Sequence, residues 1–250
     1  MNLFTNNKYL IAGTTMKNTE MPEFNNMALH SCEQTTAIIK NREQVAQHIG
    51  CSIADFVCAE QTHSANFYKV TAADRGKGAI TMDNAIPNTD ALYTYESDIL
   101  LTSFSADCVP VLLFNEKSGV IGAIHSGWQG TVKEVTPRLL HQLIVEEGNN
   151  PTAFHVYIGT ALSQQKFEVD SDVYEKFKAL GYADDFMYYK PETKKYHIDN
   201  QKTVKRQCEL AGIPSNQIVI DDTCTFLHEN GFSYRQHKKC GRHMSFIMKK

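Results

Sequence analysis

The sequence lacks an apolar run long enough to cross a membrane, and it lacks close cysteine pairs such as C-x-x-C. Its seven cysteines are an odd number with no pairing pattern, so a disulfide framework is not predicted. Residues 1–15 contain no positive cluster followed by an apolar core and a cleavage site, and we therefore expect no secretory signal. Together these absences predict a protein of the reducing cytoplasm.

The sequence also has little net charge. The formal net charge is −3 at pH 7, and no basic run is longer than Lys238-Lys239 or Lys249-Lys250. A chain with this balance has no broad electrostatic attraction for nucleic acid or for an anionic membrane surface. We expect neither of these as a partner.

What the sequence does contain is ample apolar content, 42% of 250 residues, which is enough for one core-forming domain over residues 1–250. Mixed strands and helices, with hairpins as well as crossovers, predict an α+β fold in which mixed β-sheets are flanked by helices. Apolar runs and helical spacing predict strands at 9–12, 27–30, 56–58, 67–70, 91–93, 99–101, 111–114, 120–124, 153–158, 218–220 and 244–248, and helices at 33–49, 131–147, 170–180 and 201–211. Pro137 is expected to kink its helix or to mark a later start.

The stretch 106–130 organises the rest of the chain. Its two apolar runs, 111–114 and 120–124, are separated by a polar turn and are expected to pair as an antiparallel hairpin. Cys108 precedes one strand and His125 closes the other, so the hairpin brings the two side chains to the same end of the sheet. Pro110 supports this reading, because a proline favours an irregular strand entrance.

A third side chain belongs with these two. His63 follows the apolar run 56–58 and a polar turn, so it also lies at a strand end. Imidazole and thiolate groups are ligands of zinc, and three protein ligands leave a fourth position for a water molecule whose pKa falls to roughly 7. Two histidines and one cysteine at strand ends therefore suggest an open metal site.

At these residues the sequence resembles the YfiH family, also called the YlmD or laccase-domain family. The resemblance is carried by the segments Gln61-Thr62-His63, Thr89-Asp90-Ala91-Leu92, Ala106-Asp107-Cys108 and His125-Ser126-Gly127-Trp128-Gln129-Gly130. It implies a YfiH-like fold and a zinc site built from His63, Cys108 and His125. It also implies a cytoplasmic enzyme that phosphorolyses adenosine, inosine and methylthioadenosine and deaminates adenosine, with a purine nucleoside and phosphate as its small-molecule partners.

Two residues depart from the pattern of this family. Gln129 stands where the family usually has arginine, and Cys240 stands near a usual threonine. A missing guanidinium beside the site removes a bidentate anion donor, which bears on phosphate binding. The three expected metal ligands are unaffected.

Several further residues are candidates for the chemistry, each with a structural alternative. Asp107 would transfer a proton or orient an imidazole beside Cys108, or it caps a turn. Gln61 and Gln129 would bind substrate, although Gln61 equally suits a turn. Arg242 would bind an anion or lie on the surface. Arg42, on the first predicted helix, is expected to be a solvated surface arginine, with reach into the site as the alternative.

Other functions remain open on the sequence alone. Cys108 with His125 as its base would make a hydrolase or amidase, such as one that edits a peptidoglycan precursor. The family has also been called a copper-dependent polyphenol oxidase, although one set of His, Cys and His is sparse for multicopper chemistry. A zinc-stabilised interaction module is a further alternative. His237, Cys240 and His243 have the ligand types of a second metal site, but we do not expect them to converge.

Overall fold

The structure, a computed structural model, describes residues 1–250. It has a mixed α+β architecture with three sheets, which confirms the predicted fold class. The first sheet has five strands in the order β1 (Asn2–Asn6), β2 (Leu10–Thr14), β14 (His243–Lys249), β6 (Leu100–Ser105) and β3 (Phe56–Val57). The second has six strands in the order β13 (Ile218–Ile220), β9 (Phe154–Ile158), β7 (Val109–Asn115), β8 (Ile121–Ser126), β5 (Ala91–Thr94) and β4 (Phe67–Lys69).

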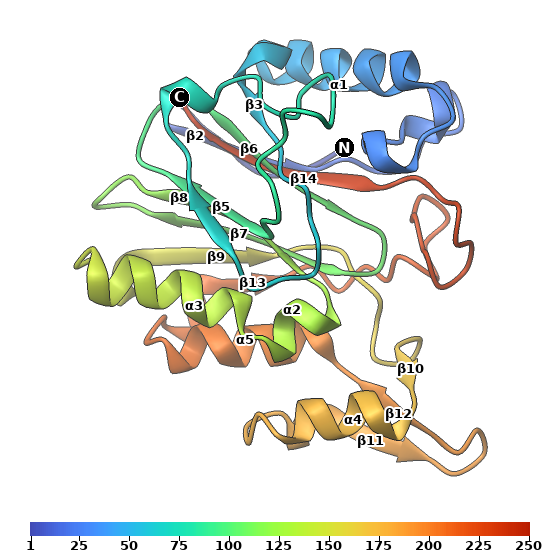
Figure 1. The fold of residues 1–250 in the computed structure, drawn as a ribbon. Helices are drawn as coiled ribbons and strands as arrows, with labels where there is room; N and C mark the ends of the chain where they lie inside the picture. Colours follow the sequence, from blue (N-terminus) through green and yellow to red (C-terminus); the bar gives the residue numbers. More distant parts are fainter.

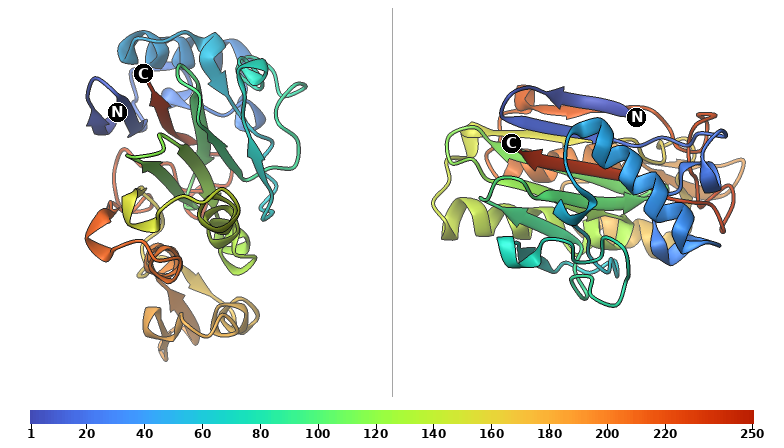
Figure 2. Two further views of the ribbon diagram at one scale, coloured as in Figure 1. Left: turned by 90° about the vertical axis from the view of Figure 1, so that its left-hand side faces the viewer. Right: turned by 90° about the horizontal axis from the view of Figure 1, so that it is seen from above.

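The two large sheets stack face to face and are covered by helices on their outer faces (Figure 1). Helix α1 (Thr35–Ile49) covers the five-stranded sheet, and helices α3 (Val135–His141) and α5 (Asn200–Leu210) cover the six-stranded sheet. The small third sheet, with strands in the order β10 (Glu168–Val169), β12 (Lys195–Ile198) and β11 (Met187–Lys190), lies with helix α4 (Ser171–Lys178) at the far end of the molecule from α1 (Figure 2). That residues 1–250 form a single domain stays a prediction.

The strands alternate their side chains between two cores, as the period of two in a β-strand requires. On β2, Ile11 packs toward α1, whereas Leu10 packs between the two sheets. On β7, Val111 and Leu113 pack toward α3 and α5, whereas Leu112 packs between the sheets. The central strands of each large sheet are therefore buried on both faces, whereas the edge strands β1 and β4 are partly exposed.

The predicted hairpin is confirmed. Strands β7 and β8 pair antiparallel, with Val111 opposite Ile124 and Pro110 opposite His125. Cys108 is the residue before β7, so it lies beside the end of β8 that carries His125. The hairpin occupies the centre of the six-stranded sheet, between β9 and β5.

Two predicted elements differ in the structure. Residues 27–30 form no strand, because the carbonyl of Met27 accepts a hydrogen bond from Arg42 Nε at 2.9 Å instead of joining a ladder. The predicted helix 131–147 is broken: α2 (Trp128–Val132) ends before Glu134, which has φ +62°, and α3 begins at Val135. Pro137 lies in the first turn of α3, where a missing N–H breaks no helical bond, so it marks the later start.

Arg42 is fully buried, and the expectation of a surface arginine is wrong. Its guanidinium Nη1 donates to the carbonyl oxygens of Gly78 at 2.8 Å and Ala79 at 2.7 Å, and its carbon Cζ lies 4.8 Å from the centre of the Phe104 ring. A buried charge is tolerated where hydrogen bonds replace those it makes to water. Arg42 thus ties α1 to the loop 76–79 and does not reach the site.

Four strands at the periphery, β1, β10, β11 and β12, are absent from the prediction. Strands β11 and β12 carry the polar and aromatic sequences MYYK and KYHI; β11 has no buried residue, and β12 buries only His197 and Ile198. Strand β1 forms an edge of the five-stranded sheet. No helix has the combination of length and apolar character that a bilayer span requires.

Candidate metal centre

The structure brings His63, Cys108 and His125 together. Their ligand atoms all lie within 4.8 Å of one another, and Cys108 Sγ is 3.8 Å from His63 Nε2. The two imidazole rings meet edge to face, with centroids 4.9 Å apart. His125 comes from the end of β8, Cys108 precedes β7, and His63 belongs to the loop between β3 and β4. Three segments that are distant in the sequence thus supply one cluster that could hold a metal ion.

Asp90 positions two of the three side chains. Its Oδ1 accepts a hydrogen bond from His125 Nδ1 at 2.8 Å and from the backbone N–H of His63 at 3.1 Å. Its Oδ2 accepts from the backbone N–H and the hydroxyl of Ser64, at 2.6 and 2.7 Å. Because Nδ1 of His125 is engaged, its Nε2 is left for a metal.

Asp90 is the main residue that the site prediction missed. It immediately precedes β5, in which Ala91 pairs with Ile124 of β8, so its carboxylate lies beside the ring of His125. The signal was present in the sequence: a carboxylate stands directly before a strand, within the segment Thr89-Asp90-Ala91-Leu92. Its partners in the loop 62–64 could not be read from that segment alone.

The electrostatics of the cluster favour the charged forms of Asp90, Cys108 and His125. Burial opposes the charge on Asp90, but the hydrogen bond and charge of His125 and the bonds from Ser64 hold its pKa below the ordinary value. Burial likewise opposes a thiolate, but His125 and His63 lower the pKa of Cys108 to about 6. Against its own burial, His125 has its pKa raised to about 9 by Cys108 and Asp90. A thiolate at neutral pH is the form that binds metal.

Gly127 leaves the space that the cluster occupies. A Cβ atom at this position would lie 2.8 Å from Cys108 Sγ and 2.9 Å from His63 Cδ2. The backbone φ of Gly127 is −62°, a value open to any residue, so the requirement here is for space and not for conformation. The start of α2 can therefore approach the cluster only with glycine.

The three ligand side chains fit a metal ion that keeps one coordination position open. Imidazole nitrogen and thiolate sulfur suit zinc and also copper. The cluster contains three residues and no fourth His, Cys, Asp or Glu. Structural zinc sites usually close with four protein ligands, whereas catalytic ones keep a position for water or substrate.

A pocket of about 270 Å³ opens beside His63 and Cys108. Its size is close to the lower end of small-molecule sites, about 300 Å³. Six of its ten lining residues are apolar or aromatic, and the other four are polar, a mixture that is usual for small-molecule sites. The lining residues are His63, Ala106, Asp107, Cys108, Trp128, Leu162, Phe167, Asn200, Tyr234 and Arg235.

Asp107 lines this pocket, but its carboxylate has other partners than an imidazole. Oδ1 accepts a hydrogen bond from the Thr225 hydroxyl and Oδ2 accepts one from the backbone N–H of Arg235, both at 2.6 Å. Asp107 has φ +82°, a left-handed conformation that aspartate tolerates better than most residues. These contacts make Asp107 an anchor for the loop that carries Tyr234 and Arg235.

The three predicted substrate-binding residues, Gln61, Gln129 and Arg242, all lie outside the pocket lining. The amide of Gln61 donates to the carbonyl of Phe104 and accepts from its N–H, each at 2.8 Å, and so braces the end of β6. Gln129 is half-buried on α2. Arg242 Nη1 donates to the backbone carbonyls of Cys240 and Gly241.

The His237, Cys240 and His243 set does not converge. His243 is buried, and both ring nitrogens are engaged: Nδ1 donates to the Thr15 carbonyl at 2.8 Å and Nε2 accepts from the Phe232 N–H at 2.7 Å. Burial lowers the pKa of His243 to about 4. It is a neutral structural histidine.

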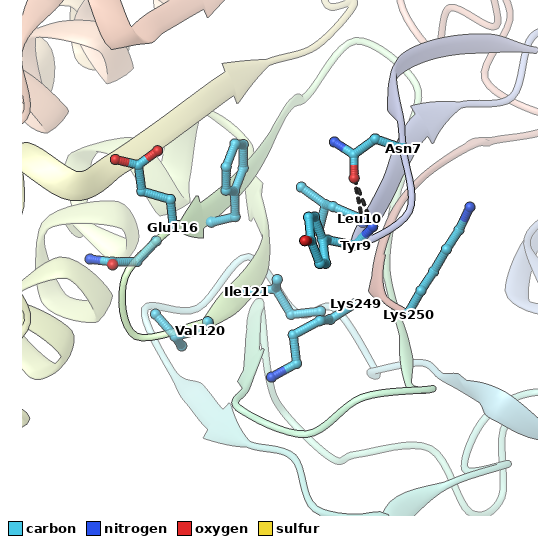
Figure 3. A pocket seen from close by; sticks show the side chains of 11 residues that line it. Asn7, Tyr9, Leu10, Glu116, Val120, Ile121, Lys249 and Lys250 are labelled. Atoms are coloured by element: carbon cyan, nitrogen blue, oxygen red, sulfur yellow. Dashed lines mark hydrogen bonds between the residues drawn. The ribbon is translucent and has the colours of Figure 1, made fainter.

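A larger pocket, of about 480 Å³, lies at the opposite end of β7, beyond Asn115 (Figure 3). Glu116, Tyr9 and Lys250 line it from different segments. Lys250 Nζ donates to Asn6 Oδ1 at 2.9 Å, and Lys249 Nζ donates to the carbonyl of Tyr95. This pocket holds no metal-binding cluster, so the smaller one at the other end of the sheet is the candidate site.

The comparisons with known proteins agree with this geometry. Residues 13–250 match the family described as multi-copper polyphenol oxidoreductase laccase. The chain belongs to this laccase-like YfiH family. Within it, the chain is 34% identical over 248 residues to a Bacillus subtilis protein named purine nucleoside phosphorylase YlmD, with 97% of this chain and 89% of that protein covered.

Solved structures of family members have the same fold. The structure of Bacillus licheniformis hypothetical protein YfiH superposes with a TM-score of 0.91 at 32% identity, covering 96% of this chain and 93% of that one. YlmD from Geobacillus stearothermophilus superposes with a TM-score of 0.88 at 27% identity over the full length of both chains. The fold prediction is therefore confirmed by two independent structures.

Proposed function

We propose that this chain is a zinc-dependent purine nucleoside phosphorylase that also deaminates adenosine. The observation that carries the proposal is the three-residue cluster of His63, Cys108 and His125 beside a pocket with apolar and aromatic walls. Relatives named purine nucleoside phosphorylase support the substrate class. The proposal places the enzyme in the cytoplasm, because all seven cysteines are free and a reducing compartment suits free thiols.

The residues of the pocket have distinct tasks in this proposal. Trp128, Phe167 and Tyr234 offer aromatic faces to a flat purine ring. Asp90 holds His125 in the orientation that directs Nε2 toward the cluster. A zinc ion bound by the three ligands supplies a Lewis acid for an oxygen of water, phosphate or substrate.

The two reactions differ in their second substrate. In phosphorolysis, a phosphate oxygen bonds to C1′ of the ribose while the bond from C1′ to N9 breaks, and the purine leaves with the electron pair and takes up a proton. In deamination, the oxygen of water bonds to C6 of adenosine, and the amine leaves as ammonia. Phosphate dependence therefore separates the two activities.

The test is chromatographic. Zinc-loaded protein is incubated with adenosine, inosine or methylthioadenosine, with and without phosphate, and the free bases and inosine are measured. Phosphate-dependent adenine, and inosine formed without phosphate, are expected from the native protein and lost in Cys108→Ala. Cys51→Ala, which removes a thiol outside the cluster, should retain both the phosphorolysis and the deamination. The absence of every product from the native protein would contradict the proposal.

A second candidate function rests on the bond between His125 Nδ1 and Asp90 at 2.8 Å. The arrangement has the residue types of a catalytic triad: Cys108 would be the nucleophile, His125 its base, and Asp90 the group that orients the base. An amidase acting on a peptidoglycan precursor would use them in this way. Its activity would survive chelation, and iodoacetamide would abolish it in the metal-free protein.

The metal itself needs a direct measurement. Elemental analysis of purified protein is expected to give one zinc per chain. Stoichiometric copper together with oxidation of a polyphenol would favour the oxidase that the family description names. Unfolding on metal removal with no turnover in any assay would favour an interaction module stabilised by zinc.

A further inference from the structure

We propose that Arg235 binds the inorganic phosphate that is consumed in phosphorolysis. This inference rests on the proposed function and assigns the anion site within the same pocket. Phosphate binding requires positive charge and directed N–H donors, and a guanidinium supplies both.

Arg235 is the only arginine or lysine among the residues that line the pocket. It shares that lining with Cys108 and His63, so its side chain and the metal cluster border the same space. Two nearby cations are engaged elsewhere: Arg242 donates to the carbonyls of Cys240 and Gly241, and Lys133 Nζ donates to the carbonyl of His63 at 2.6 Å.

Arg235 is exposed, but hydrogen bonds hold both its backbone and its guanidinium. The backbone N–H of Arg235 donates to Asp107 Oδ2 at 2.6 Å. Its Nη1 donates to the carbonyl oxygens of Glu168 at 2.8 Å and Lys166 at 3.4 Å, and its Cζ lies 5.9 Å from the centre of the Phe167 ring. A side chain held in this way loses little further freedom when it binds a ligand.

The remaining donors of Arg235 match a phosphate. Nε and Nη2 make no hydrogen bond within the protein, whereas Nη1 makes two. Nε–H and one N–H of Nη2 point in parallel from one edge of the guanidinium plane, which is the fork that binds two oxygens of a phosphate. Glu168 does not neutralise this edge by an ion pair, because its carboxylate instead lies 3.4 Å from His197 Nε2.

The experiment compares four zinc-loaded proteins: the native chain, Arg235→Gln, Arg235→Lys and Arg206→Gln. Arg206 is an exposed arginine of α5 that contacts Glu209, so its replacement is a matched loss of one guanidinium outside the pocket. Calorimetry measures binding of inorganic phosphate. Steady-state assays measure KM for phosphate in adenosine phosphorolysis and, separately, the phosphate-independent deamination of adenosine.

We expect Arg235→Gln to raise both the Kd and the KM for phosphate at least about tenfold, which is the scale of hydrogen bonds to a charged group. The Kd and KM of Arg235→Lys should lie between those of Arg235→Gln and the native chain, because lysine keeps the charge but lacks the two parallel N–H donors of a guanidinium. Arg206→Gln should resemble the native chain. Deamination should change by no more than about twofold in all four proteins, since that reaction uses no phosphate.

Unchanged phosphate Kd and KM in Arg235→Gln, with phosphorolysis intact, would overturn this inference and leave the proposed function standing. A parallel fall in deamination would also overturn it, because Arg235 would then act on the whole pocket. A third outcome is that the native chain binds phosphate and Arg235→Gln loses that binding, while the native chain shows no phosphorolysis. That result would support the anion site and contradict the phosphorylase. A native chain that binds no phosphate would overturn this inference and the proposed phosphorylase activity, but not the deaminase activity.

Discussion

Asp90 Oδ1 lies 2.8 Å from Nδ1 of His125, and the same carboxylate accepts backbone N–H groups from the loop that carries His63. One side chain thus orients one metal ligand and holds the backbone of another. Partners of this kind typically contribute a factor of about 10–100 to metal affinity.

We therefore expect Asp90→Asn to lower zinc affinity by about 10–100-fold, because an amide can accept fewer of these hydrogen bonds than a carboxylate. Competition with a chromogenic chelator measures the affinity. Asp74→Asn is a matched control, since Asp74 also accepts backbone and hydroxyl bonds, from Thr71, but lies outside the cluster. Equal affinities for Asp90→Asn and the native chain would contradict the role of Asp90.

Gly127→Ala should impair metal binding without a polar change. The added methyl would meet Cys108 Sγ at 2.8 Å and His63 Cδ2 at 2.9 Å, and relief of such overpacking costs about 1–3 kcal/mol. Gly130→Ala adds the same methyl to α2 but meets the His125 carbonyl and Val135 at 3.3 Å, with no ligand side chain in contact. Zinc content after dialysis should drop in the first variant well below that of the second.

The variant Asp107→Asn tests whether Asp107 anchors the loop that carries Arg235 or transfers a proton during catalysis. The carboxylate holds Thr225 and the backbone of Arg235, so the variant should lose about 1–3 kcal/mol of unfolding free energy and should keep its zinc. Denaturant unfolding and chelator competition measure the two quantities. A variant of native stability that has lost its activity by orders of magnitude would instead make Asp107 a proton-transfer group.

Glu147 should give a pH-dependent contribution to stability. Burial opposes its charge, but hydrogen bonds from Tyr95, Tyr93 and Lys69 hold its pKa below the ordinary value. Because the folded pKa is lowered, the contribution is present above the unfolded pKa of about 4.3 and is lost as pH falls through the folded pKa. Unfolding free energy measured from pH 7 to pH 3 should show this loss in the native chain and not in Glu147→Gln. Glu146→Gln, at an exposed position, should follow the native curve.

The hairpin and two of the ligands could be predicted because their pattern is local. Apolar runs of strand length around a polar turn determine the pairing of β7 with β8, and that pairing alone brings Cys108 beside His125. The placement of Arg42 could not be predicted in this way. Its carbonyl partners, at Met27, Gly78 and Ala79, come together only when three separate segments are packed.

The break between α2 and α3 was predicted only in part: Pro137 indicated a later helix start, but nothing indicated the turn at Glu134. Glu134 adopts φ +62°, a conformation that sequence patterns assign to glycine or asparagine. The apolar spacing continues across it, so the periodicity indicated one helix. The break lets α2 direct Gly127 at the metal cluster while α3 packs along the six-stranded sheet.

The position of β14 has a consequence for the order of folding. Strand β14 lies between β2 and β6, and Thr14 meets Ser245 across 231 positions of sequence. Contacts of such long separation carry a large loop-closure cost and form slowly, whereas a hairpin forms from neighbouring residues. We expect Cys108 and His125 to approach each other early on a nascent hairpin, and the five-stranded sheet to close only after distant parts of the chain have met.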